Sequence, residues 1–169
     1  MKKFTFLFYF IWLLIITVFQ PTLVQWIGIF GTGPDLFLIF VICAAMLRGM
    51  WDGAICGFVF GLAFDMIIGR MVGMNAVLYM YAGLLVGIVN GRYISSDSAL
   101  TNAFFVFAAS LICGILYYSA YNMVWGDLGF IKAFLRTILP KSVYSAALAF
   151  VLFVPIRKSF GLIKVKRLF

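Results

Sequence analysis

Six long apolar runs, separated by short segments that hold most of the charged residues, make up most of the chain. A helix needs about 20 predominantly apolar residues to cross the hydrocarbon core of a bilayer. Because the charges lie between the runs and do not alternate with apolar residues, we expect lipid to surround most of the chain. The pattern predicts an all-α integral membrane protein with about six transmembrane helices. The predicted spans cover residues 4–19, 34–47, 53–68, 74–89, 99–125 and 142–156 of a single transmembrane domain, residues 1–169.

The first two runs leave alternatives open. The run 4–19 follows two lysines, as in a signal peptide, but residues 20–22 (Gln-Pro-Thr) provide no small-residue cleavage site. We therefore predict a helix that stays in the membrane. The run 36–47 is about 18 Å long as a helix, short for a core of about 30 Å. A re-entrant segment, with five spans in total, is the alternative.

The segments between the runs predict the connections. Residues 21–33 carry no charge, contain three glycines and include Trp26, which predicts an interfacial loop. Pro34-Asp35 is typical of a helix start, because proline and an acidic side chain suit the first turn. Residues 90–98 predict a polar loop, and residues 126–141 predict an amphipathic helix on the membrane surface.

Composition argues against a further domain, and charge predicts how the helices are oriented in the membrane. Hydrophobic residues are 66% of the 169 residues and charged residues 11%, which leaves no room for an attached catalytic domain. The net charge of +8 comes from basic residues at the ends of apolar runs, so it indicates membrane topology and not nucleic-acid binding. With six spans, nine basic residues lie on the side of the termini and four on the other. The positive-inside rule therefore predicts cytoplasmic termini, a bias that five spans would lose.

Glycine recurs at every fourth position through the third run and again through the fourth. Glycines at this spacing form a ridge along one face of a helix. A glycine ridge lets two helix backbones approach closely in lipid, at a crossing angle of about −40°. We therefore predict that the third and fourth helices pack tightly. The predicted packing residues are Gly49, Gly53, Gly57, Gly61, Gly69, Gly73, Gly83, Gly87 and Gly91.

Asp65 interrupts the third run and leaves two roles open. A carboxylate at the centre of a membrane helix costs about 2.5–3.5 kcal/mol on insertion scales, so it must face protein or water. It is therefore a candidate contact for a partner or ligand. The structural alternative is that Asn75, Arg70 or free backbone amides of residues 71–75 satisfy it.

Catalytic and metal-binding chemistry is not expected. The chain has no His and no Glu, and its five Asp residues are scattered, so the usual general bases and most metal sites cannot be built. The three cysteines lie inside apolar runs without a CxxC pair, so neither a disulfide framework nor a metal site is indicated. We expect no enzymatic activity, no cofactor and no metal.

The C-terminal tail, residues 157–169, mixes basic and apolar side chains. Such clusters bind anionic lipid at the cytoplasmic leaflet with about 1 kcal/mol per basic residue, and docking to a cytosolic partner is the alternative. The basic residues of the tail are Arg157, Lys158, Lys164, Lys166 and Arg167.

Several motifs, in order along the chain, resemble the rod shape-determining protein MreD family of bacteria. The motifs are Gln20-Pro21, Gly33-Pro34-Asp35-Leu36, the glycine-rich stretch from Gly53 to Asp65, Gly69, Gly73, Asn75-Ala76 and Gly83. The likeness covers roughly residues 1–92 by motif and the whole chain by length, span number and short polar loops.

The resemblance implies a non-enzymatic subunit of the cell-wall elongation machinery in the bacterial inner membrane. Such a subunit binds MreC and acts through it with MreB, RodA and a transpeptidase in organising peptidoglycan synthesis. Candidate partner contacts are Asp35, Asp65, Trp26, Phe130 and Phe134.

The resemblance also implies a fold similar to the substrate-binding subunits of energy-coupling-factor transporters. That similarity raises an alternative function, a subunit that binds or transports a vitamin-like small molecule. This alternative predicts a polar pocket open to the outside. The residues available to line one are Asn75, Tyr79, Tyr81, Asn122 and Asp127.

Overall fold

The computed structural model describes residues 2–27, 33–67, 71–94, 98–125 and 134–161. Within these ranges the chain is helical, with no strand, which confirms the all-α prediction. The helices are α1 (Lys2–Ile27), α2 (Leu36–Arg48), α3 (Met50–Ile67), α4 (Met74–Val89), α5 (Ala99–Trp125) and α7 (Leu139–Gly161), with two π-helical segments, η1 (Asn90–Ile94) and η2 (Phe134–Ile138).

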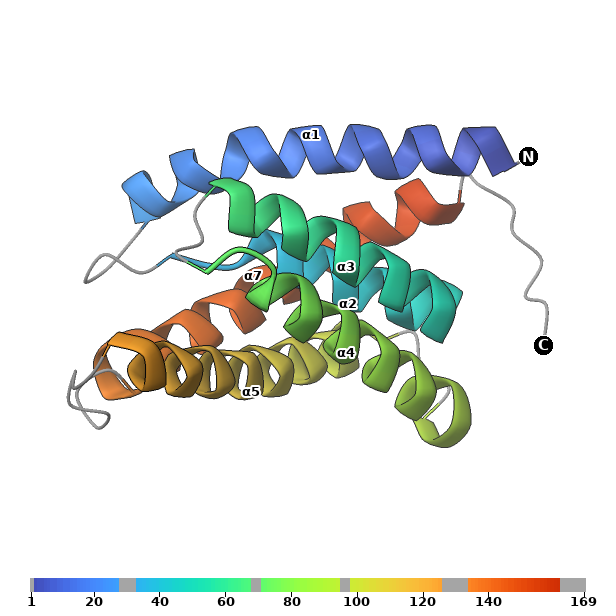
Figure 1. Cartoon of the computed structure of the whole chain (residues 1–169). Coiled ribbons are helices and arrows are strands. Elements are labelled where there is room, and N and C mark those ends of the chain that lie inside the picture. The colour runs from blue at the N-terminus through green and yellow to red at the C-terminus, as the bar shows by residue number, and fades with distance from the viewer. Residues whose placement is uncertain (1, 28–32, 68–70, 95–97, 126–133, 162–169) are drawn as a thin grey trace.

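The helices form a bundle whose successive members run in opposite directions (Figure 1). The start of α1 and the end of α7 lie at the same end of the bundle, which we call the terminal end. The opposite end, where α2 and α4 begin, is called the distal end. α1 lies along one edge of the bundle and α5 along the opposite edge. α7 begins beside α5 and ends next to α1, where the rings of Phe8 and Phe160 are 5.0 Å apart.

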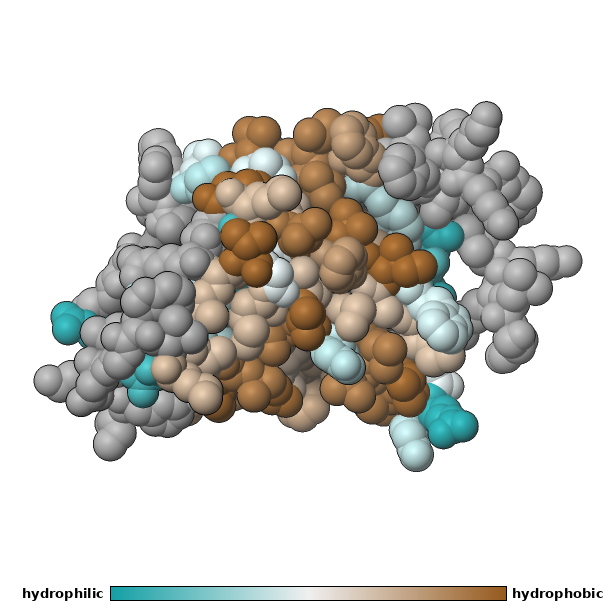
Figure 2. All heavy atoms as spheres, in the orientation of Figure 1, coloured by the Kyte–Doolittle hydropathy of each residue, from teal (hydrophilic) through white to brown (hydrophobic). Residues whose placement is uncertain are grey.

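Four helical segments of the described chain are long and apolar enough to cross a membrane. They are Met50–Ile67, Met74–Ile94, Ala99–Met123 and Phe134–Phe160, and two shorter apolar helices are Phe8–Thr22 and Leu36–Arg48. Hydrophobic side chains cover most of the face over α3 and α4 that Figure 2 shows. The length and composition of these helices fit a membrane protein, as the apolar runs predict.

α2 is the core of the bundle. Every side chain from Leu36 to Met46 is buried by the surrounding helices. This environment suits a helix that is apolar on all sides and has no face for water. The start of α2 lies beside Gln20 of α1, and the carbonyl of Met46 accepts a hydrogen bond from Asn90 at the end of α4, at 3.2 Å. α2 therefore runs from the distal to the terminal end and does not turn back as a re-entrant segment. Protein surrounds it, so its short length need not match the bilayer.

α3 and α4 pack backbone against backbone. A Cβ atom added at Gly61 would lie 2.6 Å from the Cα atom of Ala76, closer than real Cβ contacts occur. One added at Gly57 would lie 2.5 Å from the carbonyl carbon of Tyr79. Only glycine fits such positions, and the close approach gives the van der Waals contact that holds helices together in lipid. The glycines in this interface are Gly53, Gly57, Gly61, Gly83 and Gly87.

Three glycines of the predicted ridge do not pack in this way, which corrects the prediction. Gly49, Gly73 and Gly91 have open space where a side chain would be. Gly49 and Gly73 have φ angles of 99° and 92°, so glycine is needed for the positive-φ backbone that ends α2 and begins α4. Gly69 lies outside the described residues.

Two predicted loops are wrong in part. α1 continues through Pro21 to Ile27, so residues 21–27 are helical and only residues 28–32 lie outside the description. Proline usually ends a helix because it lacks an N–H group, which is why the sequence predicts a break. Asn90–Ile94 continues α4 as a π-helical turn, so the predicted loop 90–98 begins at least five residues too early.

The predicted surface helix 126–141 is also corrected. Residues 126–133 lie outside the described chain, whereas Phe134–Ile138 runs directly into α7. α7 itself begins before residue 142 and passes through Pro155 to Gly161. Phe134–Phe160 therefore forms one continuous apolar segment long enough to cross a membrane. By contrast, α4 and α5 have the bounds predicted for the fourth and fifth runs.

Candidate functional site

Asp35 is the centre of a buried polar cluster at the distal end of the bundle. Its side chain is 1% exposed and caps α2, because Oδ1 accepts a hydrogen bond from the backbone N–H of Leu38 at 3.1 Å. Oδ2 accepts the hydroxyl hydrogen of Tyr79 from α4. Lys141 of α7 also reaches Oδ2, with its Nζ atom at 2.8 Å. One carboxylate thus joins three helices.

Two further side chains hold the backbone around Asp35. The amide of Gln20 donates from Nε2 to the carbonyl of Pro34 and accepts from the N–H of Leu36, both at 2.9 Å. The hydroxyl of Ser145 accepts from the N–H of Asp35 at 3.0 Å. The start of α2 therefore has its polar groups satisfied although it lies inside the bundle, as helix ends in an apolar environment require.

Asp65 caps the start of α4, as Asp35 caps the start of α2. The cap residue of α4, Gly73, has no side chain, and Asp65 at the end of α3 accepts from the N–H of Ala76 at 3.2 Å. Its other oxygen accepts from Nδ2 of Asn75 at 2.7 Å. The acid at the end of a glycine ridge thus caps the helix that the ridge packs against.

Replacing Asp65 by Asn is expected to lower the free energy of unfolding by about 1–3 kcal/mol, the cost of leaving a buried donor unsatisfied. The new amide nitrogen would face either Asn75 or the N–H of Ala76, and both of those groups are donors. Thermal unfolding in detergent measures the effect. The parent protein is the reference for this measurement. A variant as stable as the parent would contradict this role.

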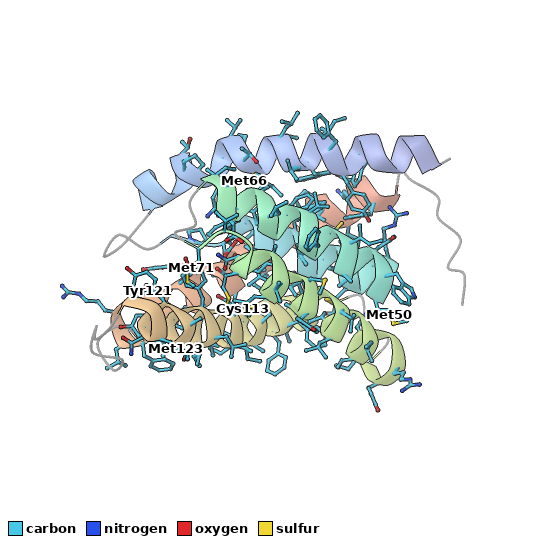
Figure 3. The ribbon with its side chains drawn as sticks, in the orientation of Figure 1. Met50, Met66, Met71, Cys113, Tyr121 and Met123 are labelled. Atoms are coloured by element: carbon cyan, nitrogen blue, oxygen red, sulfur yellow. The ribbon has the colours of Figure 1, made fainter. Side chains whose placement is uncertain are left out.

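A cavity of about 500 Å³ lies beside the Asp35 cluster. Lys141 and Asp35 meet at its wall, and Tyr117, Tyr118 and Tyr121 of α5 form much of another side. Figure 3 labels Cys113 and Tyr121, which α5 contributes. The lining residues are Asp35, Leu38, Phe64, Asn75, Tyr79, Ser110, Cys113, Gly114, Tyr117, Tyr118, Tyr121, Thr137, Ile138 and Lys141.

A second charged cluster lies at the terminal end. Nε of Arg48 lies 2.8 Å from Oδ2 of Asp52, one helical turn further on, across the turn at Gly49. The same guanidinium donates to the hydroxyl of Tyr9 at 3.2 Å and so ties α1 to the end of α2. This cluster is an anchor between α1, α2 and α3.

The predicted partner contacts differ in their exposure in the structure. Asp35 and Asp65 are each 1% exposed and bound to their own chain, so neither carboxylate lies on the outer surface of the described chain. Their role as contacts for a partner or ligand stays a prediction. Phe134 is partly exposed in η2. The side chain of Trp26 and all of Phe130 lie outside the described residues. So do Lys164, Lys166 and Arg167, whereas Arg157 and Lys158 are exposed near the end of α7.

The sequence prediction missed Lys141, Gln20 and Ser145 as site residues. Lys141 was counted only as a basic residue on the outer side of the membrane, yet it has the Asp35 carboxylate as partner. A lysine directly before the apolar run 142–156 was the available signal, because a charged residue at a membrane span needs a partner or water. Gln20 belongs to the Gln20-Pro21 motif, which indicates the family but no role for the side chain, and nothing in the sequence points to Ser145.

The described residues contain no group of three or more His, Cys, Asp or Glu that could hold a metal ion. Cys43, Cys56 and Cys113 are free and buried. The site therefore consists of an ion pair, tyrosine hydroxyls, amides and apolar walls, a composition that can bind a ligand or fix helices.

Comparison with protein families matches residues 1–163 to the family described as rod shape-determining protein MreD. Neither the curated proteins nor the solved structures include a match to this chain, so no structural neighbour supports the expected likeness to energy-coupling-factor subunits. The family match spans nearly the whole chain and agrees with the motifs in its first half. The chain belongs to the rod shape-determining protein MreD family.

Proposed function

We propose that this protein is a non-enzymatic inner-membrane subunit of the cell-wall elongation machinery, which binds MreC and helps maintain rod shape by organising peptidoglycan synthesis. Membership of the MreD family, which implies a role in rod shape determination, is the observation that carries the proposal. The architecture supports it, because nearly the whole described chain is a membrane bundle held by close backbone packing. Through MreC the subunit acts with MreB, RodA and a transpeptidase.

In this arrangement the terminal end of the bundle faces the cytoplasm. Arg48, Arg92 and the exposed pair Arg157 and Lys158 belong to helix ends on that side, where the positive-inside rule expects basic residues. Arg157 and Lys158 would then contact anionic lipid or a cytosolic partner. The Asp35 cluster and its cavity face the periplasm.

The α3–α4 pair is the surface that we assign to the single membrane helix of MreC. Its backbones cannot move apart without losing contact, so it presents a rigid outer face. That face is hydrophobic, as Figure 2 shows. The exposed apolar side chains of the two helices include Ile55, Phe58, Val59, Met66, Val77 and Leu85.

Placing tryptophan at Val59 and Leu85 is expected to reduce the recovery of MreC several-fold when this protein is purified from detergent extracts. Both side chains are exposed, at 47% and 57%, so a larger side chain replaces lipid contacts and leaves the bundle intact. It does obstruct a helix that lies against this face. Immunoblotting of co-purified MreC at equal bait levels measures the change.

Leu116→Trp on α5 is the matched control, because Leu116 is exposed to a similar extent, 48%, on another helix. Recovery of MreC should be unchanged with this variant. If the Val59 and Leu85 variants recover as much MreC as the parent, the α3–α4 face is not the binding surface. If the parent itself recovers none, the MreC assignment fails.

The small-molecule alternative has one observation in its favour, the cavity beside Asp35. Asn75 and Tyr79 line it as that alternative predicts. Tyr81 does not, because it is 55% exposed on α4, and Asn122 is also outside the lining set. Asp127 lies outside the described residues. Depletion in the parent cell separates the two functions: rounding of rods supports the shape role, whereas a growth requirement for a nutrient supports uptake.

A further inference from the structure

We propose that the cavity beside Asp35 binds an uncharged, ring-bearing organic molecule whose carbonyl oxygen accepts a hydrogen bond from Lys141. The cavity is lined from α2, α3, α4, α5, η2 and α7, which is the kind of enclosure that small-molecule sites have. Its volume of about 500 Å³ also falls within the range of such sites, roughly 300–1,000 Å³. This ligand site is independent of the MreC surface, since it lies within the bundle.

The ligand must present an acceptor, because the accessible charged group is a donor. The side chain of Lys141 is 31% exposed, whereas that of Asp35 is 1% exposed and has both oxygens occupied. An ammonium group carries three hydrogens and accepts none. One hydrogen is directed to Asp35, and the ammonium lies 5.4 Å from the centre of the Phe64 ring. A further hydrogen is therefore available to a ligand in the cavity.

The charges of the site favour a neutral molecule. Lys141 and Asp35 form a pair whose formal charges cancel. The nearby carboxylate of Asp65 is matched by the amino-terminal end of α4, which it caps. An added anion or cation would bring an uncompensated charge into a cavity within a membrane protein, and burying an unpaired charge is costly.

The tyrosines of α5 provide aromatic side chains against which a ring can pack. Tyr117 and Tyr121 are four positions apart and Tyr118 and Tyr121 are three apart, so they lie on neighbouring positions of one helix face. Aromatic rings pack against one another in offset or edge-to-face contacts. Phe64 of α3 adds another aromatic side chain to the lining.

Cys113 provides a reporter for occupancy, because it lines the cavity. We would measure its rate of modification by N-ethylmaleimide, by peptide mass spectrometry, in full-length protein in lipid nanodiscs. The probes are three molecules of similar size: neutral phenylacetamide, anionic phenylacetate and cationic phenethylammonium. Cys43, which is fully buried and outside the lining, is the internal control. Thermal unfolding with each probe gives a second measurement that does not depend on the thiol.

Phenylacetamide is expected to slow modification of Cys113 by about threefold or more at several times its dissociation constant and to raise the melting temperature. The two charged probes should have smaller effects. Thr137→Trp should abolish protection, because Thr137 is an exposed residue of the lining and a large ring there obstructs entry. Leu135→Trp, at an exposed residue outside the lining, should leave protection intact.

Removal of the ammonium tests the polar contact directly. The double variant Lys141→Met with Asp35→Asn keeps the site neutral and should reduce protection by phenylacetamide. Stronger protection by either charged probe would overturn the assignment of a neutral ligand. No effect of any probe on either labelling or melting temperature would overturn the site itself, whatever the outcome of the MreC experiments.

Discussion

Replacing Lys141 by Met is expected to lower the free energy of unfolding by about 3–5 kcal/mol, the cost of leaving a buried charge without its partner. The charge that would lose its partner is the carboxylate of Asp35, which is 1% exposed and caps the central helix α2. Tyr79 and the N–H of Leu38 would remain as hydrogen-bond donors, but neither carries the opposite charge. Thermal unfolding of the purified protein in detergent measures the loss.

The double variant Lys141→Met with Asp35→Asn should recover much of that stability. Asparagine is a good helix cap whose Oδ1 can still accept from Leu38. Its amide nitrogen would donate to the hydroxyl oxygen of Tyr79, so no charge is left unpaired. Lys158→Met is the matched control, because Lys158 is an exposed lysine further along the same helix. If Lys141→Met is no less stable than Lys158→Met, the ion pair does not hold the distal end of α2.

The helical architecture was predictable because lipid imposes a simple constraint. A chain that is mostly apolar must bury its backbone polar groups in helices, so long apolar runs mark helices without knowledge of their packing. The bounds of α4 and α5 follow directly from this constraint. The helix of α1 beyond Pro21 did not, because Pro21 is typical of a break and tertiary contacts decide whether the helix continues.

The interior of the site was predictable only in part. The motif Pro34-Asp35 marks a helix start, and Asp35 does cap α2. That Asp35 meets Lys141 depends on α7 lying beside the start of α2, and no local pattern records a contact between residues so far apart in the chain. The sequence pattern around a charged residue in a short polar segment is also the same whether that residue faces water or a cavity.

The glycine repeat also shows that a sequence pattern does not reveal the partner of each residue. Gly57 and Gly73 occupy equivalent positions in the fourfold repeat, yet only Gly57 meets another backbone. Gly73 begins α4 with a φ angle of 92°, a conformation that other residues rarely adopt. The spacing identifies glycines that share a helix face, whereas the partner and the end of the helix decide what each one does.

Replacing Gly57 by Ala is expected to produce the largest loss that a single methyl group can cause in this protein. The added carbon would meet the backbone of Tyr79 and Met80, at 2.7 Å from the nitrogen of Met80. Because backbone atoms cannot rotate away as a side chain can, α3 and α4 must separate. Overpacking costs about 1–3 kcal/mol and occasionally more, and we expect the upper end or beyond. Tyr79 also donates to Asp35, so separation weakens the polar cluster.

Gly91→Ala provides the matched control, because a Cβ at Gly91 meets nothing within 4 Å. Its melting temperature in detergent should equal that of the parent, while that of Gly57→Ala should fall sharply. Complementation of a depleted strain gives the functional counterpart, with rods restored by Gly91→Ala and round cells with Gly57→Ala. Equal stability and equal complementation would show that close approach of α3 and α4 is dispensable. Since the rigid outer face assigned to MreC depends on that approach, the proposed mode of binding would then lose its physical basis.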